Sequence, residues 1–397
     1  MNIVYTASII SHGGGGHIYS VRDTSLLMQK YYPDVSVRVV TFGLGPSVVL
    51  KRENIEYVHI YCNGLNLLGA LAEFRRFCLV YNITHIHSFD KKAFFFSMAV
   101  GRKVFRFFTK PGGANSNEFY PRASCTFFFS SENFDYFKER HRSRNAILLS
   151  SRVSPPVKDE ARIDSLSKRL SISVDQLVLL RIGRFSRYYE VTSLQAMKLH
   201  QYFRSNGVNV ATVFIGEIED EAFLYELRER ASKEGSIHFV TDKKYTTDAA
   251  QLLGLGHVVV GTGRGFIEGA LSGRAMFVPV AGQEFPFFVR PESIEYFQAT
   301  NFSERSTIPL ECEVQSNLEM ALKLIRLDKG VGVGALTKAE AFRVFDIEGS
   351  ISKIYSGYSM AERDLGCHVF DFCVMGAATA LVFFKAYLVK RFSSVQS

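Results

Sequence analysis

The chain has 397 residues, of which 47% are hydrophobic and 22% are charged, and its net charge is +8. Single hydrophobic cores stop growing at about 250–300 residues, so these values exclude a disordered chain and favour two folded domains. The basic residues are dispersed along the sequence, which argues against a nucleic-acid partner, whereas the mild positive excess suits an anionic ligand or an anionic membrane surface.

The cysteines are scattered, without a CxxC pair or a zinc-type Cys/His spacing. This pattern indicates reduced thiols in a cytoplasmic protein, and we expect neither a metal site nor a bound cofactor. The N-terminal segment MNIVYTASII lacks the charged region and the cleavage site of a signal peptide. It leads into a glycine-rich loop, which predicts a first buried strand.

Apolar runs alternate with amphipathic stretches through the first part of the chain. Strands are expected over 2–9, 35–42, 55–61, 83–89, 103–108 and 125–130, with helices over 18–31 and 70–81. This alternation is typical of a parallel sheet with helices on both faces. The segment SSRVSPPVKDE, with its paired prolines, then predicts a linker.

The same rhythm restarts after the linker and predicts a second doubly wound domain. Strands are expected over 177–182, 208–216, 236–241, 256–261 and 275–280, with helices over 190–204 and 219–233. The predicted domains are therefore 1–153 and 154–350.

Near the C-terminus, the run FCVMGAATALVFF is apolar and is followed by KAYLVKRF. A membrane-spanning helix needs about 20 apolar residues, so this shorter run favours an interfacial helix or one packed on the protein over a spanning helix. Lys385, Lys390 and Arg391 are placed to meet lipid headgroups. We therefore predict peripheral contact with the cytoplasmic membrane face through residues 365–392, with packing on the protein itself as the alternative.

The segment SHGGGGHIYS lies between the first strand and the first helix. Its glycines, Gly15 and Gly16 among them, allow a substrate to approach the backbone closely and suit the rim of an acceptor site. His17 closes the loop and is a candidate general base. The alternative is a histidine that caps the helix or fills a turn.

Polar residues also follow two further strands of the first half. His87 and Asp90 lie at the end of THIHSFD, and His85 and His87 should share one face of the strand. We predict acceptor contacts for His87 and Asp90, the alternative being a satisfied buried histidine pair. Lys110, before a Gly-Gly pair, is a candidate catalytic cation, or part of a plain turn.

In the second half, LRIGRFSRYYE places three arginines around one glycine at a strand end. Arginine forks match phosphate oxygens, so the cluster of Arg181, Arg184 and Arg187 predicts phosphate binding. Arg184 is the first choice for a donor-binding residue and Arg187 the second.

The most informative segment is VVVGTGRGFIEGALSG, in which a buried strand ends in glycines and a helix begins. Backbone N–H groups at such a helix start, at Gly263, Arg264 and Gly265, suit a diphosphate. Glu268, expected in the first turn, would be stabilised by the helix dipole and could accept hydrogen bonds from ribose hydroxyls. The alternative is a capping glutamate without a ligand.

Taken together, Gly-Arg-x-x-Arg after a strand and Gly-x-Gly-x-x-x-x-Glu-Gly-Ala-x-x-Gly resemble the group 1 glycosyltransferases (family 4), best over about Leu177–Val280. The resemblance implies a GT-B fold, in which two Rossmann-like domains face each other across a cleft and C-terminal helices, here about 351–397, cross back to the first domain. It implies a donor domain at 154–350 and an acceptor domain at 1–153. The glycine loop also resembles that of lipid-linked muropeptide N-acetylglucosaminyltransferases.

Residue by residue, the resemblance assigns Arg184 to the donor phosphate and Glu268 to the nucleotide ribose. The family's lysine is replaced by Tyr189, for which Arg187 is a substitute, and its first glutamate of Glu-x7-Glu is replaced by Val260. The family pattern implies a retaining, metal-independent transfer of a sugar from a nucleotide diphosphate to a saccharide or polyprenyl-linked acceptor, in surface polysaccharide or glycolipid synthesis. A GT-B sugar-nucleotide epimerase and a non-catalytic GT-B-like binding subunit are the alternatives.

Overall fold

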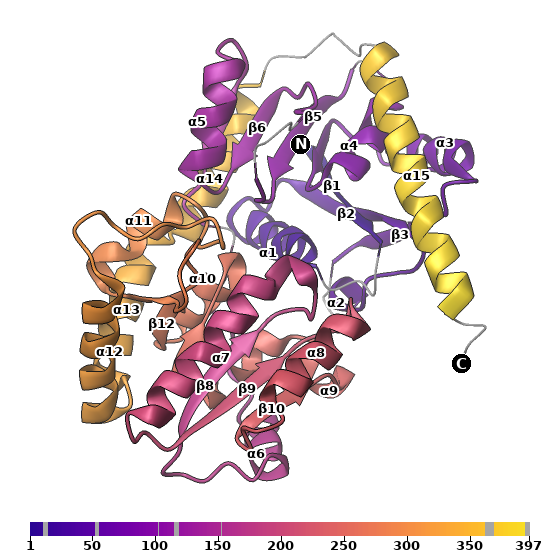
Figure 1. Cartoon of the computed structure of the whole chain (residues 1–397). Coiled ribbons are helices and arrows are strands. Elements are labelled where there is room, and N and C mark those ends of the chain that lie inside the picture. Colours follow the sequence, from indigo (N-terminus) through magenta and orange to yellow (C-terminus); the bar gives the residue numbers. More distant parts are fainter. Residues whose placement is uncertain are drawn as a thin grey trace. The chain divides into compact units, whose positions relative to one another are not determined.

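The computed structural model describes the chain except for residues 11–14, 52–54, 102, 115–118, 152, 362–368 and 394–397. The chain forms two compact units (Figure 1). The first unit combines Met1–Arg152 with Ile347–Ser397, and the second is Val153–Asp346.

The described part of the first unit contains a seven-stranded sheet in the order β3-β2-β1-β4-β5-β6-β7, and its strand pairs are parallel. The strands are β1 (Asn2–Ile9), β2 (Ser36–Gly43), β3 (Tyr57–Tyr61), β4 (His85–Ser88), β5 (Phe105–Lys110), β6 (Cys125–Phe128) and β7 (Ala146–Leu148). The helices are α1 (Gly16–Tyr31), α2 (Val48–Lys51), α3 (Leu67–Val80), α4 (Lys91–Met98), α5 (Ser131–Arg140), α14 (Ile347–Ser359) and α15 (Val369–Ser393).

Successive side chains of each strand point to opposite faces of this sheet, and both faces are buried because an apolar cluster packs on each. Tyr5 belongs to one apolar cluster and Val4 to the other. Phenylalanine fills much of the second cluster: the rings of Phe42 and Phe96 stack with centroids 3.8 Å apart. The sequence has 35 phenylalanines and no tryptophan, so these rings provide the largest apolar core volumes.

The second unit contains, within its described residues, a six-stranded sheet in the order β10-β9-β8-β11-β12-β13. The strands are β8 (Leu177–Ile182), β9 (Val210–Ile215), β10 (Ile237–Val240), β11 (Val258–Val260), β12 (Ala275–Val278) and the antiparallel edge strand β13 (Phe287–Val289). The helices are α6 (Glu160–Arg169), α7 (Glu190–Ser205), α8 (Glu221–Ala231), α9 (Lys243–Thr246), α10 (Gly263–Leu271), α11 (Ile294–Gln298), α12 (Val314–Asp328) and α13 (Val331–Val344), with short 3-10 helices η1 (Arg187–Tyr189), η2 (Ala249–Leu255) and η3 (Pro291–Ser293).

The predicted two-domain α/β architecture is confirmed, and each strand predicted in the second half is present. The prediction missed β7 and the antiparallel edge strand β13, which have three residues each. At the C-terminus, the 13-residue apolar run is only part of a 25-residue helix, α15. The helix is longer because the Ala, Leu, Lys and Arg residues of KAYLVKRF have high helix propensity.

Candidate functional site

The second sheet has a topological switch point between β8 and β11. From β8 the chain moves outward to β9 on one side and later returns to β11 on the other. In open α/β sheets of this kind, ligands bind outside the carboxyl ends of the strands at the switch point. The elements that meet there are the end of β8, the end of β11 and the start of α10; a Cβ at Gly265 would lie 3.8 Å from the carbonyl oxygen of Ile182.

Glycines shape the turn from β11 into α10. A Cβ at Gly261 would come 2.7 Å from the Cα of Phe266, so no larger residue fits there. Gly263 has a φ of +48°, a conformation that favours glycine, and its N–H donates to the carbonyl of Asn301 at 3.1 Å. The turn thereby directs the start of α10, with its backbone N–H groups and positive dipole end, to the switch point.

Glu268 lies one turn further along α10 than the sequence predicted. The helix starts at Gly263, which puts Glu268 in the second turn, and α10 has no acidic residue in its first turn. The helix dipole is therefore not its main partner. Instead, Arg264 Nε donates to Glu268 Oε1 at 2.6 Å, and the two side chains are only 10% and 13% exposed. The predicted donor residues Arg264 and Glu268 form one ion pair beside the glycine turn.

The cation at the end of β8 is Arg181, which is 4% exposed. Its guanidinium lies against Gly183, where a Cβ would come 2.6 Å from Nη2, and its Nη1 donates to the carbonyl of Ile182. Burial lowers the pKa of Arg181, and the nearby Tyr189 and Glu304 act in the opposite direction. Arginine nevertheless stays protonated at neutral pH, so a buried positive charge lies beside the switch point.

Arg184 follows Gly183 and is held by two partners. It forms an ion pair with Glu219, and Nη2 donates to the hydroxyl of Tyr189 at 3.3 Å. Burial acts to lower the pKa of Arg184, but Tyr189 and Glu219 together raise it. Tyr189 thus supplies a hydroxyl that orients Arg184.

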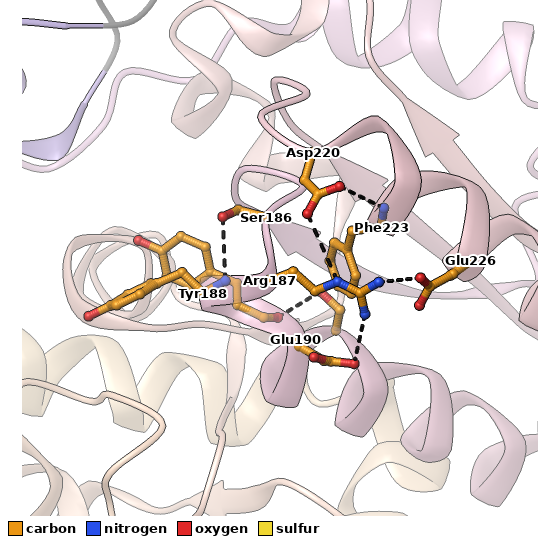
Figure 2. A network of polar contacts seen from close by, with 9 residues as sticks. Ser186, Arg187, Tyr188, Glu190, Asp220, Phe223 and Glu226 are labelled. Carbon is orange, nitrogen blue, oxygen red and sulfur yellow. Dashed lines mark hydrogen bonds and ion pairs between the residues drawn. The ribbon is translucent and has the colours of Figure 1, made fainter. Parts of the chain in front are cut away.

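Arg187, the second predicted phosphate ligand, points to α8 (Figure 2). Its guanidinium forms ion pairs with Glu190, Glu226 and Asp220 and lies over the ring of Phe223, 5.1 Å from the centroid. Three carboxylates already neutralise this charge, so the structure gives Arg187 the geometry of a residue that holds the loop after β8 against α8.

Sequence reasoning missed the loop after α11, which lies against both α7 and α10. Asn301 and Phe302 have φ values of +55° and +51°, and Phe302 stacks on Phe266 with centroids 3.9 Å apart. Glu304 accepts from the backbone N–H of Thr192 at 2.8 Å and from its hydroxyl. No local motif predicts the role of Glu304. Its position near Arg181 depends on the packing of segments that are more than 100 residues apart in the sequence.

The first sheet has its own switch point, between β1 and β4. Three polar residues, Ser8, His17 and Asp90, meet there. Asp90 caps α4 through the N–H groups of Lys92 and Ala93, and it accepts from the N–H and hydroxyl of Ser8 at 2.7 and 2.8 Å. His17 Nε2 lies 2.9 Å from the carbonyl oxygen of Ser8.

The geometry of His17 decides its tautomer. A carbonyl only accepts, so Nε2 carries the proton, and neutral His17 presents Nδ1 as an acceptor. Gly15, the N-cap of α1, lies beside the ring, where a Cβ would come 2.8 Å from Nδ1, and Gly16 is exposed. These described glycines and His17 form one end of the glycine loop, whose residues 11–14 lie outside the described structure.

For His87, the structure favours the alternative of a satisfied buried histidine over a contact with the acceptor. His87 is completely buried, with Nδ1 2.5 Å from the hydroxyl of Tyr358 and Nε2 2.6 Å from that of Thr109. Burial lowers the pKa of His87 to about 3, and neither ring nitrogen remains for an acceptor. His85 shares its face, as predicted, and both rings pack against Tyr358 of α14.

Lys110 ends β5 and is 6% exposed. Its Nζ lies beside the following turn, 3.7 Å from where a Cβ at Gly113 would stand. Gly112 and Gly113 both have positive φ, +123° and +89°, which makes the turn specific for glycine. Lys110 and its turn therefore lie at the carboxyl edge of the first sheet, two strands from β1.

Comparison with known proteins establishes the fold class. No family model and no curated protein matches the sequence. Anabaena HepE in complex with UDP and glucose has a TM-score of 0.64 at 14% identity, covering 90% of this chain and 99% of HepE. A glycosyltransferase from Rickettsia africae has a TM-score of 0.62 at 12% identity, covering 90% and 97%. UDP-GlcNAc 2-epimerase from Neisseria meningitidis, bound to UDP-GlcNAc, has a TM-score of 0.55 at 11% identity, covering 90% and 100%. The chain therefore has the two-unit α/β fold of GT-B proteins.

Proposed function

We propose that this protein is a glycosyltransferase that moves a sugar from a nucleotide diphosphate to a hydroxyl acceptor. The observation that carries the proposal is the meeting of a buried cation, Arg181, with Arg184 and the glycine-bounded start of α10 at one switch point. A diphosphate is the ligand that such a set of donors recognises. HepE, which shares the fold, is described in complex with UDP and with UDP-glucose, so UDP is the first nucleotide to test.

The proposed residue roles follow from charge and position. Arg181, Arg184 and the N–H groups of Arg264 and Gly265 bind the diphosphate, and Glu268 accepts from the ribose hydroxyls. Gly263, whose N–H donates to the carbonyl of Asn301, shapes the turn that presents them. When the bond between the sugar C1 and the β-phosphate oxygen breaks, negative charge develops on the diphosphate, and these donors stabilise it. We propose that this step proceeds without a metal, because the arginines and backbone N–H groups supply the positive charge that the departing diphosphate needs.

The acceptor is proposed to bind the first unit. Gly15 and Gly16 form its rim, and His17, through Nδ1, takes the proton of the attacking hydroxyl as the oxygen bonds to C1. Asp90 fixes Ser8, which accepts from His17, and Lys110 adds positive charge at the same sheet edge. We propose a saccharide or polyprenyl-linked acceptor and action at the cytoplasmic membrane face. We also propose retention of configuration as in family 4, which requires the hydroxyl to attack C1 on the same face from which the diphosphate departs.

The test of the nucleotide site is Glu268→Ala, with the exposed Glu229→Ala in α8 as the matched control. Loss of a carboxylate that accepts two ribose hydroxyls should weaken UDP binding by about 1.5–3 kcal/mol, measured by titration calorimetry. The control should bind as the parent protein does. Unchanged affinity in Glu268→Ala, or no nucleoside diphosphate binding by the parent, would refute the site.

A second candidate, a sugar-nucleotide epimerase, is favoured by the likeness to UDP-GlcNAc 2-epimerase. Incubation with UDP-sugars and no acceptor separates the two. An epimerase converts the sugar nucleotide into its epimer, whereas a transferase leaves it unchanged or releases UDP and free sugar slowly. A non-catalytic binding subunit does neither, although it retains nucleotide binding.

A further inference from the structure

Helix α15 is unusual among the helices of the first unit. Its segment Phe372–Arg391 has 20 residues and a mean hydropathy of 1.9, which by length and composition is enough to cross a membrane, and only 17% of it is buried. An apolar helix of this length, if it were a soluble core helix, would be covered on most sides. Most of α15 is not.

One stripe of α15 is fixed to the body of the first unit. Met375, Thr379 and Phe383, at intervals of four residues, are at most 5% exposed, and α15 packs along α4 (Figure 1). The backbone approach is close: a Cβ at Gly64 would come 2.4 Å from the carbonyl oxygen of Ala380, and one at Gly376 would come 3.0 Å from the ring of Phe95. To cross a bilayer the helix would have to abandon this packing.

The opposite stripe of α15 is apolar and exposed. Val374, Leu381 and Val389 are 45%, 67% and 63% exposed. The loop at Gly64, which α15 contacts, leads into α3, and there Leu65 and Leu68 are 72% and 81% exposed. The two helices thus present large apolar side chains from neighbouring segments of the same unit.

Cationic residues outnumber anionic ones in the described side chains of the two helices. In the described side chains of 67–80 and 372–391, five residues are cationic and one is anionic. The cations are Arg75, Arg76, Lys385, Lys390 and Arg391, and the acid is Glu73. Pairing of this face with a second copy would bring like charges together, whereas an anionic lipid surface complements them.

We propose that α15 and α3 form a docking surface for an anionic phospholipid bilayer, with α15 lying in the plane of the interface. The stripe at Met375, Thr379 and Phe383 remains on the protein, and the stripe at Val374, Leu381 and Val389 enters the boundary between headgroups and acyl chains. The cations bind lipid phosphates. This surface does not depend on the reaction at the nucleotide site.

The experiment is flotation of the full-length protein with vesicles, one set of neutral phosphatidylcholine and one containing phosphatidylglycerol. Binding should require the anionic lipid. Arg75→Gln with Arg76→Gln should weaken it by roughly thirtyfold, since one cation near an anionic surface contributes about fivefold. Leu381→Glu should weaken it at least as much. The matched controls are Arg228→Gln with Arg230→Gln, and Leu310→Glu, all at exposed positions of the second unit.

Each other outcome overturns the proposal. Equal binding to both vesicle sets would remove the electrostatic part, and equal loss in variants and controls would remove the assigned surface. Protein that stays with the vesicles after alkaline carbonate extraction would mean a spanning helix. Concentration-dependent dimers in solution that Leu381→Glu dissociates would mean that the face binds a second copy. Circular dichroism confirms that each variant is folded.

Discussion

Replacement of Arg181 by methionine should make the protein more stable and a weaker nucleotide binder at the same time. Arg181 is 4% exposed, and among the described residues no carboxylate lies within ion-pair distance of it; the hydrogen bond that it makes is to the carbonyl of Ile182. Burial of an ion costs several kcal/mol, and replacement of buried ionic groups by apolar residues of similar volume often stabilises by about 1–4 kcal/mol. Methionine keeps the packing of the unbranched apolar part of the side chain and removes the charged end.

From these values we expect Arg181→Met to raise the free energy of unfolding by about 1–2 kcal/mol, at the low end because the guanidinium keeps one hydrogen bond. Loss of charge-assisted hydrogen bonds to a diphosphate should cost about 1.5–3 kcal/mol, or roughly 10- to 150-fold in the Kd of UDP. A variant that is more stable but binds UDP more weakly would identify a charge that is retained for a ligand.

The assays are urea unfolding and titration calorimetry with UDP, and the matched control is Arg187→Met. Arg187 is 45% exposed and bound to three carboxylates, so its loss should lower stability slightly and leave UDP binding unchanged. The reasoning is refuted if Arg181→Met is clearly less stable than the parent and binds UDP equally well, because Arg181 would then be a structural residue.

Two further predictions concern the first unit. The pKa of His87 is lowered to about 3 from 6.5, so its contribution to stability is fully present above pH 6.5 and is lost as the pH falls towards 3. Between pH 7 and pH 5 this loss should be about 2 kcal/mol, and His87→Gln should remove it from the pH profile of urea unfolding; an unchanged profile would contradict the burial of a neutral ring. Gly64 has a φ of +88°, and a Cβ there would press against α15, so Gly64→Ala should lower the free energy of unfolding by about 1–3 kcal/mol and speed proteolysis of α15. Gly69→Ala, on the open face of α3, should do neither. Equal proteolysis rates in the two variants would exclude the close packing.

The sequence determined the fold class because its signals are local. Many of the predicted strands are nearly continuous apolar runs, such as LVLLRI at 177–182, because a parallel sheet with both faces buried favours such runs. The sequence also located the glycine turn before α10 and the arginines after β8. Both can be recognised from residue type and from position directly after a predicted strand.

Only the tertiary structure decided which of these charged and polar groups are already bound by other side chains of the protein. Arg187 and Arg181 lie six residues apart in one motif, yet packing surrounds Arg187 with carboxylates from α7 and α8 and buries Arg181 without one. His87 looks like a strand-end ligand in the sequence, but Tyr358 from the distant α14 occupies its Nδ1. Glu304 joins the site through Thr192, more than 100 residues away. Such partners are set by contacts between segments remote in sequence, and the local pattern of residues carries no record of them.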